Sequence, residues 1–225
     1  AGLAAAVASC LDLKTYELEG NIHVTPAAEQ CLPAIIVREG PSAVASQAET
    51  VVPTEGVFLV PAFTGLGAPH GGVGARGLGA PHWDDSARGM LTGLTRSSSL
   101  AQASRAVIES IAYQVRDVFD EMQSATGGAL RVLMADGGVT RNAQLMQFQA
   151  DILGVPVQRN NTPELSAMGA AYLAGLAVGV WSSTDDIEAL PRSIDRFEPR
   201  IEATERERLY AGWKEAVART MYRPA

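Results

Sequence analysis

The sequence is poor in several features that mark secreted or membrane-inserted proteins. Its 225 residues include two cysteines, Cys10 and Cys31, and so sparse a pair favours reduced thiols over a disulfide framework. An uncharged stretch at 165–181 is shorter than the roughly 20 apolar residues that span a bilayer. These absences favour a cytoplasmic protein without a membrane partner.

An excess of positive charge is also absent. Lysine and arginine total 18 against 25 aspartates and glutamates, which gives a net charge of −7, and the basic residues form no stripe or block. Nucleic acids and anionic membrane surfaces are therefore poor partners for this chain. With 47% hydrophobic residues, the sequence instead fits a globular protein that buries a core of its own.

Side-chain clusters that carry chemistry are missing too. His23, His70 and His82 are scattered along the chain, so no metal site is predicted. Asp84 and Asp85 are adjacent on a loop, where carboxylates are usually solvated rather than paired for acid–base catalysis. With no nucleophile elbow and no Cys–His pair in the sequence, no catalytic residue is predicted.

Residues 65–88 are expected to form a glycine-rich loop that contains a duplication. The hexapeptide GLGAPH at 65–70 recurs unchanged at 77–82, an offset of 12 residues. Solenoid repeats need several units of about 20 or more residues. The pair is therefore a local duplication and not a repeat architecture.

Hydrophobic patterns predict the elements in the first half of the chain. One or two short strands are expected within 3–22, a short helix at 27–32 between Pro26 and Pro33, and a helix at 41–51. An unbroken apolar run predicts a buried strand at 57–60. The three-four apolar spacing of 100–122 predicts a long amphipathic helix, with its N-cap among the serines at 97–99 and its end at Gly127 and Gly128.

The next segment has the order of a βαβ unit. A strand is expected at 130–135, a turn at Asp136, Gly137 and Gly138, a helix at 142–153 that ends at Gly154, and a strand at 155–158. This order places the chain in the α/β class, with the turn at the carboxyl edge of the sheet, where ligands bind.

The turn itself suggests a nucleotide site. Gly137 and Gly138 would let the backbone approach a ligand where a β-carbon would collide, and the following helix presents free N–H groups. Asn142, expected in the first helical turn, offers a donor and an acceptor to a purine or ribose. A plain turn, with Asn142 as a helix N-cap, is the alternative.

Two further helices are expected towards the carboxyl end. The uncharged stretch 165–181, rich in alanine and glycine, predicts a buried helix packed closely on neighbouring backbone. Residues 204–221 predict a charged amphipathic helix, in which Thr204 and Glu207 have the spacing of a capping box.

Residues 57–223 resemble the carboxy-terminal domain of the FGGY carbohydrate kinases, and of the glycerol kinases among them in particular. The matching phrases occur in the family's order at 60–69 (VPAFTGLGAP), 83–84 (WD), 87–89 (ARG), 93–96 (GLTR), 109–114 (ESIAYQ), 136–138 (DGG), 145–154 (LMQFQADILG) and 170–177 (AAYLAGLA). Residues 18–20 and Gln30 are also similar to the family, whereas 31–54 match it weakly.

The resemblance implies a ribonuclease-H-like domain of the actin, hexokinase and Hsp70 ATPase superfamily, with a mixed sheet flanked by helices. Residues 1–225 would be this carboxy-terminal domain, amino-terminally truncated. The family's nucleotide contacts carry over to Gln30, Gly138 and Asn142, with Gly137 beside them, and a fourth falls on Pro26. The implied reaction converts ATP and glycerol to ADP and glycerol 3-phosphate, with Mg²⁺ bound largely through the preceding domain.

The chain departs from the family at three places. Pro26 replaces a glycine and supplies no N–H, which would weaken nucleotide binding. The duplication adds residues before Trp83, where the family runs directly from one hexapeptide into Trp-Asp. Ala103 stands where the family has a larger apolar residue.

Several interpretations stay open from the sequence. The family's catalytic aspartate, glycerol-binding residues and phosphate loops lie upstream of such a segment, and none of the matching phrases occurs here. The isolated chain is therefore expected to be inactive, to meet glycerol through the missing domain, and to expose an apolar docking face. Another FGGY kinase such as a xylulokinase, a silent binding module or a decayed gene product are the alternatives, and a homo-oligomer is possible.

Overall fold

The computed structural model describes residues 3–9, 15–20, 22, 56–63, 81–82, 84, 86–162 and 164–223. The helices predicted at 27–32 and 41–51, Gln30, Pro26 and the first hexapeptide lie outside these residues. The described elements are, in order, β1 (Ala4–Ser9), β2 (Thr15–Glu19), β3 (Phe58–Val60), β4 (Met90–Thr92), α3 (Leu100–Thr126), β5 (Leu133–Ala135), the 3₁₀ helix η2 (Gly138–Arg141), α4 (Ala143–Leu153), β6 (Val157–Asn160), α5 (Leu165–Ala177), α6 (Thr184–Glu188), β7 (Ile194–Phe197) and α7 (Ala203–Met221).

The strands form three small sheets that support the predicted α/β class. β1 and β2 make an antiparallel hairpin, and β3 pairs antiparallel with β4. The third sheet has the order β5-β6-β7, with β5 and β6 parallel and β7 antiparallel to β6. Since η2 and α4 connect β5 to β6, the predicted βαβ unit is confirmed, although β5 begins three residues later than expected.

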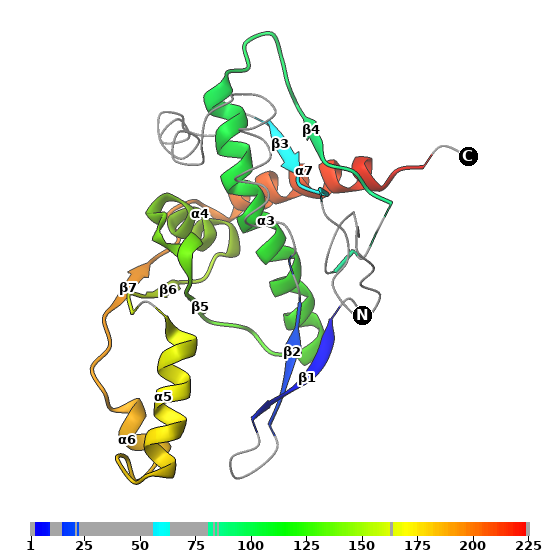
Figure 1. The fold of residues 1–225 in the computed structure, drawn as a ribbon. Helices are drawn as coiled ribbons and strands as arrows, with labels where there is room; N and C mark the ends of the chain where they lie inside the picture. Colours follow the sequence, from blue (N-terminus) through cyan, green and yellow to red (C-terminus); the bar gives the residue numbers. More distant parts are fainter. Residues whose placement is uncertain are drawn as a thin grey trace.

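α3 is the longest of the described helices and runs through the centre of the molecule (Figure 1). Its start is fixed by a capping box: Ser99 accepts from the backbone N–H of Gln102, whose side chain accepts from the N–H of Ser99. Its end is Gly127, which has φ 67°, a conformation that glycine adopts without steric cost. The predicted caps are confirmed, and the helix extends one turn beyond the predicted residue 122.

An aromatic cluster joins α3, α4, α7 and β3 into one core. The ring of Tyr113 on α3 stacks on Trp213 of α7, with centroids 5.2 Å apart. It meets Phe148 of α4 edge-on at 5.5 Å and lies 5.8 Å from Phe58 of β3. Tyr113 and Trp213 are each 1% exposed, so this cluster contributes strongly to stability through buried apolar area.

A buried carboxylate, Asp117 of α3, links the same elements through polar contacts. It is 7% exposed and accepts from the hydroxyl of Tyr210 at 2.7 Å and from Nε1 of Trp213 at 2.8 Å. Nε2 of His82 lies 3.2 Å from Oδ2 of Asp117, the oxygen that also accepts from Trp213. Burial, together with Asp117, raises the pKa of Tyr210, so this hydroxyl stays protonated and donates.

Arg116, the neighbour of Asp117, secures α3 to α4 and α7 on another side. It donates to both carboxylate oxygens of Glu207 at 2.8 and 2.9 Å and to the carbonyl of Ile152 at 3.0 Å. Its guanidinium carbon lies 3.8 Å from the ring centroid of Tyr210. The capping box predicted for Thr204 and Glu207 is therefore wrong: α7 begins at Ala203 after Glu202, without a side-chain cap, and Glu207 pairs with Arg116 instead.

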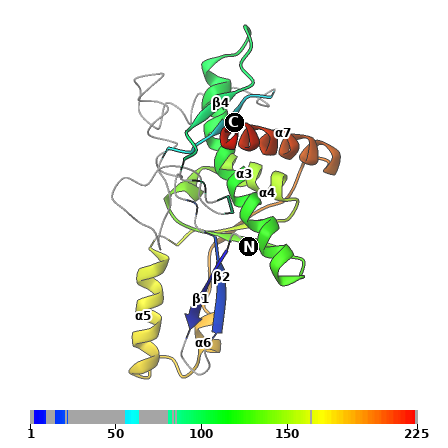
Figure 2. The same cartoon turned by 90° about the vertical axis from the view of Figure 1, so that its right-hand side faces the viewer.

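The prediction that α5 is a buried helix is also wrong. Gly175 is its only buried residue, and Leu173 is 51% exposed. α5 and α6 project away from the block of α3, α4 and α7 (Figures 1 and 2). Alanine and glycine add little apolar area, so an uncharged helix rich in both can face solvent at small cost.

α5 is held mainly by local contacts. The ring of Trp181 packs against Gly175 and lies edge-on to Tyr172, with centroids 5.4 Å apart. No helix among the described residues has the length and apolar character needed to cross a membrane. Apolar side chains are exposed on α5 and just beyond it, where Val178 is 77% exposed; that they form a docking face stays a prediction.

Candidate nucleotide site

The turn after β5 adopts a conformation that depends on Gly137. This residue has φ 90° and ψ 177°, which residues with a β-carbon rarely adopt. The chain then forms η2, whose first backbone bond runs from the N–H of Thr140 to the carbonyl of Gly137 at 3.2 Å. The helix predicted at 142–153 is confirmed as α4, which begins at Ala143, and η2 lies between the turn and this helix.

The position of Gly138, unlike that of Gly137, does not require glycine for its backbone conformation. Its φ lies outside the positive range in which glycine is favoured, and a β-carbon built on it would meet no atom within 4 Å. Neither backbone conformation nor protein packing therefore demands glycine here. The space in front of Gly138 is open, as a site for a closely approaching ligand requires.

Asn142 is the N-cap of α4 and not a residue of its first turn. Its side-chain Oδ1 accepts from the backbone N–H of Leu145 at 3.0 Å. The alternative interpretation of Asn142 as a cap is confirmed. Because the bond uses the oxygen, the side-chain NH₂ group is still available as a donor to a ligand.

A cavity of about 710 Å³ opens at the carboxyl ends of the parallel strands β5 and β6. Gly137 and Gly138 form one wall, with Arg141 and Arg159 beside them. Residues 160–162 and 164–166 also line the cavity. The volume suits a nucleotide-sized ligand, and the position is the carboxyl edge that the βαβ pattern predicted.

A second cavity, of about 420 Å³, lies between the sheet and α5. Its walls include Met134, Leu165, Met168 and Tyr172, so its lining is more apolar than that of the first cavity. Met134 is 70% exposed. We assign the nucleotide candidate to the first cavity, because the glycine turn and the arginines belong there.

The sequence did not single out Arg159, and no local signal could have done so. It lies on the middle strand β6, where an arginine suggests only a solvent-facing side chain. Its contacts to Thr140, Arg141 and Asp195 come from residues 18 to 36 positions away. Folding is needed to bring them together.

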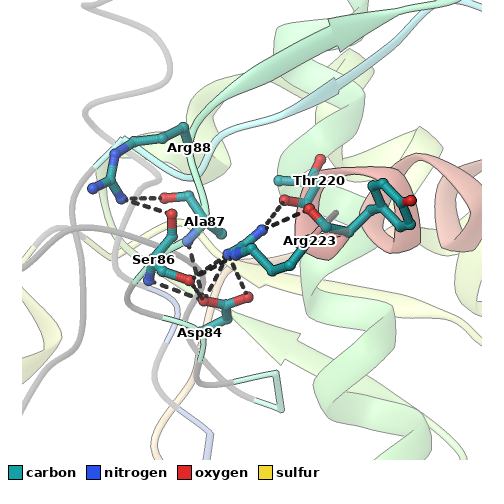
Figure 3. A network of polar contacts seen from close by, with 7 residues as sticks. Asp84, Ser86, Ala87, Arg88, Thr220 and Arg223 are labelled. Carbon is teal, nitrogen blue, oxygen red and sulfur yellow. Dashed lines mark hydrogen bonds and ion pairs between the residues drawn. The ribbon is translucent and has the colours of Figure 1, made fainter. Parts of the chain in front are cut away.

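Asp84, in the loop before β4, makes structural contacts. Asp84 accepts from the backbone N–H and hydroxyl of Ser86 at 2.9 and 2.7 Å, and from Arg223 at 3.0 Å (Figure 3). Hydrogen bonding from Ser86 lowers the pKa of Asp84. Asp85 lies outside the described residues, so its predicted solvation stays a prediction.

Metal ligation offers no competing interpretation within the part of the chain that the structure describes. No group of three or more His, Cys, Asp or Glu side chains is arranged there to hold a metal ion. Gln30, the remaining predicted nucleotide contact, lies outside the described residues. Gly137, Gly138 and Asn142 are brought together at one turn.

Known proteins are similar to this chain in both sequence and fold. Residues 17–178 match the model of the FGGY family of carbohydrate kinases, C-terminal domain. A glycerol kinase of Caldanaerobacter subterraneus subsp. tengcongensis is 48% identical over 223 residues, 98% of this chain and 42% of that protein. Glycerol kinase 2 of Thermotoga maritima is 46% identical over 212 residues, 92% of this chain and 39% of that protein.

A solved structure agrees with these sequence matches. The crystal structure of Plasmodium falciparum glycerol kinase with ADP superimposes with a TM-score of 0.86 at 32% identity, covering 99% of this chain and 43% of that one. The chain thus spans about two fifths of the length of the relatives it matches.

Proposed function

Because the chain belongs to the FGGY family of carbohydrate kinases, we propose that it is the nucleotide-binding part of a kinase that transfers phosphate from MgATP to glycerol. The observation that carries the proposal is the open cavity at Gly138, where neither backbone conformation nor packing requires glycine. The glycerol kinase relatives, at 46–48% identity, support glycerol over another acceptor sugar such as a pentulose.

In this proposal, the chain's residues bind and orient the adenosine side of the nucleotide. The backbone at Gly138 approaches the ligand closely, and the NH₂ group of Asn142 donates to it while Oδ1 caps α4. Arg141 lines the same cavity, together with the acidic residues Asp136 and Glu164, and its charge is proposed to pair with the phosphates of the nucleotide. Gln30 is a further proposed contact, and Pro26 is expected to weaken binding.

Residues 1–225 form the carboxy-terminal domain of a ribonuclease-H-like, two-domain kinase in this proposal. Proton abstraction from glycerol and most contacts to Mg²⁺ are assigned to the preceding domain of such an enzyme, because no residue of this chain is a candidate for either. The exposed surface of α5 is then a surface for docking within the complete enzyme. The isolated chain is expected to bind ADP weakly and to lack kinase activity.

A titration tests the proposal directly. NMR spectra of the chain with increasing ADP should show saturable shifts of the amide signals of Gly138 and Asn142, whereas inorganic phosphate at equal concentration should not reproduce them. Recombination with the amino-terminal part of the Caldanaerobacter relative should then restore formation of glycerol 3-phosphate. Absence of ADP-dependent shifts, both alone and after recombination, would contradict the proposed function.

A further inference from the structure

Arg159 reaches from the sheet to the turn that forms the candidate site. On β6 it lies opposite Ala135 of β5 and Asp195 of β7. Its Nη1 donates to the carbonyl of Thr140 at 2.8 Å and lies 3.4 Å from the carbonyl of Arg141. These are the last carbonyls of η2, and the end of a helix leaves such groups without intrahelical partners.

The guanidinium is itself fixed on its other side. Nη2 donates to the carboxylate of Asp195, and the guanidinium carbon lies 5.4 Å from the ring centroid of Phe197. The hydrogen bond from Arg159 lowers the pKa of Asp195, which keeps this partner ionised at neutral pH. The side chain of Arg159 is 17% exposed, so its position is determined by these contacts.

Few other described contacts restrain the turn. Gly137 and Gly138 have no side chains, and a β-carbon at either would meet no atom within 4 Å. The hydroxyl of Thr140 donates to the carbonyl of Gly137 at 2.7 Å, and Val139 packs against the core. These contacts hold the start and middle of η2. At its end, the backbone N–H of Asn142 donates to the carbonyl of Val139 at 3.2 Å, and Arg159 adds the side-chain contact directly before Asn142.

We propose that Arg159 is a positioning residue for the nucleotide: it fixes the end of η2 and so keeps Gly138 and Asn142 at the separation that the ligand needs. This inference rests on the proposed function. Arg159 acts through the turn, since Nη1 donates to its carbonyls and Nη2 to Asp195, while Nε is buried and has no hydrogen-bond partner among the described residues. Its loss should therefore loosen the turn before any ligand is present.

The test combines Arg159→Gln with Arg159→Lys and a matched control. Arg196→Gln on β7 removes an exposed pair with Glu198, in which both side chains are more than half exposed. Amide hydrogen exchange at 138–142 without ligand, ADP affinity by NMR titration and the urea midpoint are measured for each variant. These readouts separate the order of the turn, nucleotide binding and overall stability.

The expected results follow from a charge-assisted hydrogen bond to the turn. Arg159→Gln should speed exchange at 138–142 by about tenfold or more and weaken ADP binding by roughly 5- to 30-fold. Arg159→Lys, which keeps the charge but loses the fork of donors, should recover part of both effects. Arg196→Gln should leave both unchanged.

Each contrary outcome has a defined meaning. Unchanged exchange in Arg159→Gln overturns the inference, and so does faster exchange with unchanged ADP affinity, which would show a purely structural role. Failure of the unsubstituted chain to bind ADP, both alone and after recombination with the amino-terminal part, overturns the proposed function, and this inference with it. If Arg159→Gln does not fold, Asp195→Asn replaces it, with the same changes expected at smaller size.

Discussion

The block of α3, α4, α7 and β3 and the projecting pair α5 and α6 differ in how the chain stabilises them. The block combines stacked aromatic rings with the buried contacts of Asp117 and Arg116. α5 buries one glycine and relies on Trp181 for its packing. Hydrophobic composition alone therefore does not decide whether a helix is buried, because α5 is more apolar than α3 and yet more exposed.

The strongest test of this difference is a matched pair of truncations. Trp213→Ala should lower the free energy of unfolding by about 3–5 kcal/mol, since it leaves a large cavity beside Tyr113. Leu173→Ala on α5 should change it by less than about 0.5 kcal/mol. Urea unfolding followed by circular dichroism measures both, and a similar loss in the two variants would refute the comparison.

The buried carboxylate gives the next largest effect. Asp117→Asn should lower the free energy of unfolding by about 2–3 kcal/mol. The carboxylate accepts hydrogen bonds with both oxygens, whereas the amide replaces one oxygen by an NH₂ group, which cannot accept from a neighbouring donor. Asp120→Asn, three residues along the same helix with a 42% exposed side chain, should cost less than about 0.5 kcal/mol. Equal urea midpoints for the two variants would show that Asp117 does not link the block.

The two glycines of the candidate site should separate stability from binding. Gly137→Ala should cost about 1–2 kcal/mol, because alanine is strained at φ 90°. Gly138→Ala should leave the urea midpoint nearly unchanged but weaken ADP binding at least about tenfold, since its methyl group would occupy the open cavity. Unchanged ADP affinity in Gly138→Ala would argue against close approach of the ligand at this position.

A smaller, pH-dependent effect is expected at Asp84. Its pKa is lowered in the folded chain by the hydrogen bonds from Ser86, so its stabilising contribution is complete above the unfolded value of about 3.9. It is lost as the pH falls through the lowered folded value. At pH 7 the free energy of unfolding of the unsubstituted chain should exceed that of Asp84→Asn by less than about 1 kcal/mol. The urea midpoints of the two chains should converge towards pH 3.

The smallest change in stability is expected from substitutions of the exposed apolar residues on α5 and directly after it. Leu173→Ser combined with Val178→Ser should change the free energy of unfolding, measured by urea denaturation, by less than about 0.5 kcal/mol. It should also reduce self-association, since both side chains are more than half exposed. Sedimentation velocity at several concentrations measures this, and undiminished association would exclude this surface as the contact.

Local signals in the sequence predicted the limits of elements well. Ser99, Gly127 and Gly154 are caps whose side chain or flexible backbone acts within a few residues, and all three are found as expected. The same logic failed at Thr204 and Glu207, because α7 already begins at Ala203, which places Thr204 inside the helix, and Glu207 pairs with the distant Arg116. A capping box is therefore predictable only where the start of the helix is itself predictable.

Contacts between distant segments limited what could be predicted about the site. The glycine turn followed from its place after a strand, and Asn142 from its place before a helix. Arg159 escaped prediction because its partners lie on η2 and β7. The same holds for Asp117, whose donors on α7 lie 93 and 96 residues away.

The contact between His82 and Asp117 bears on how the duplicated loop arose. Removing residues 65–76 or residues 71–82 yields the same polypeptide, with one hexapeptide leading directly into Trp83. In that shortened chain, the histidine of the one remaining hexapeptide occupies the place next to Trp83 that His82 holds now. Deleting twelve residues once would therefore remove the duplication. The shortened chain would keep a histidine at the position from which His82 contacts Asp117 of α3.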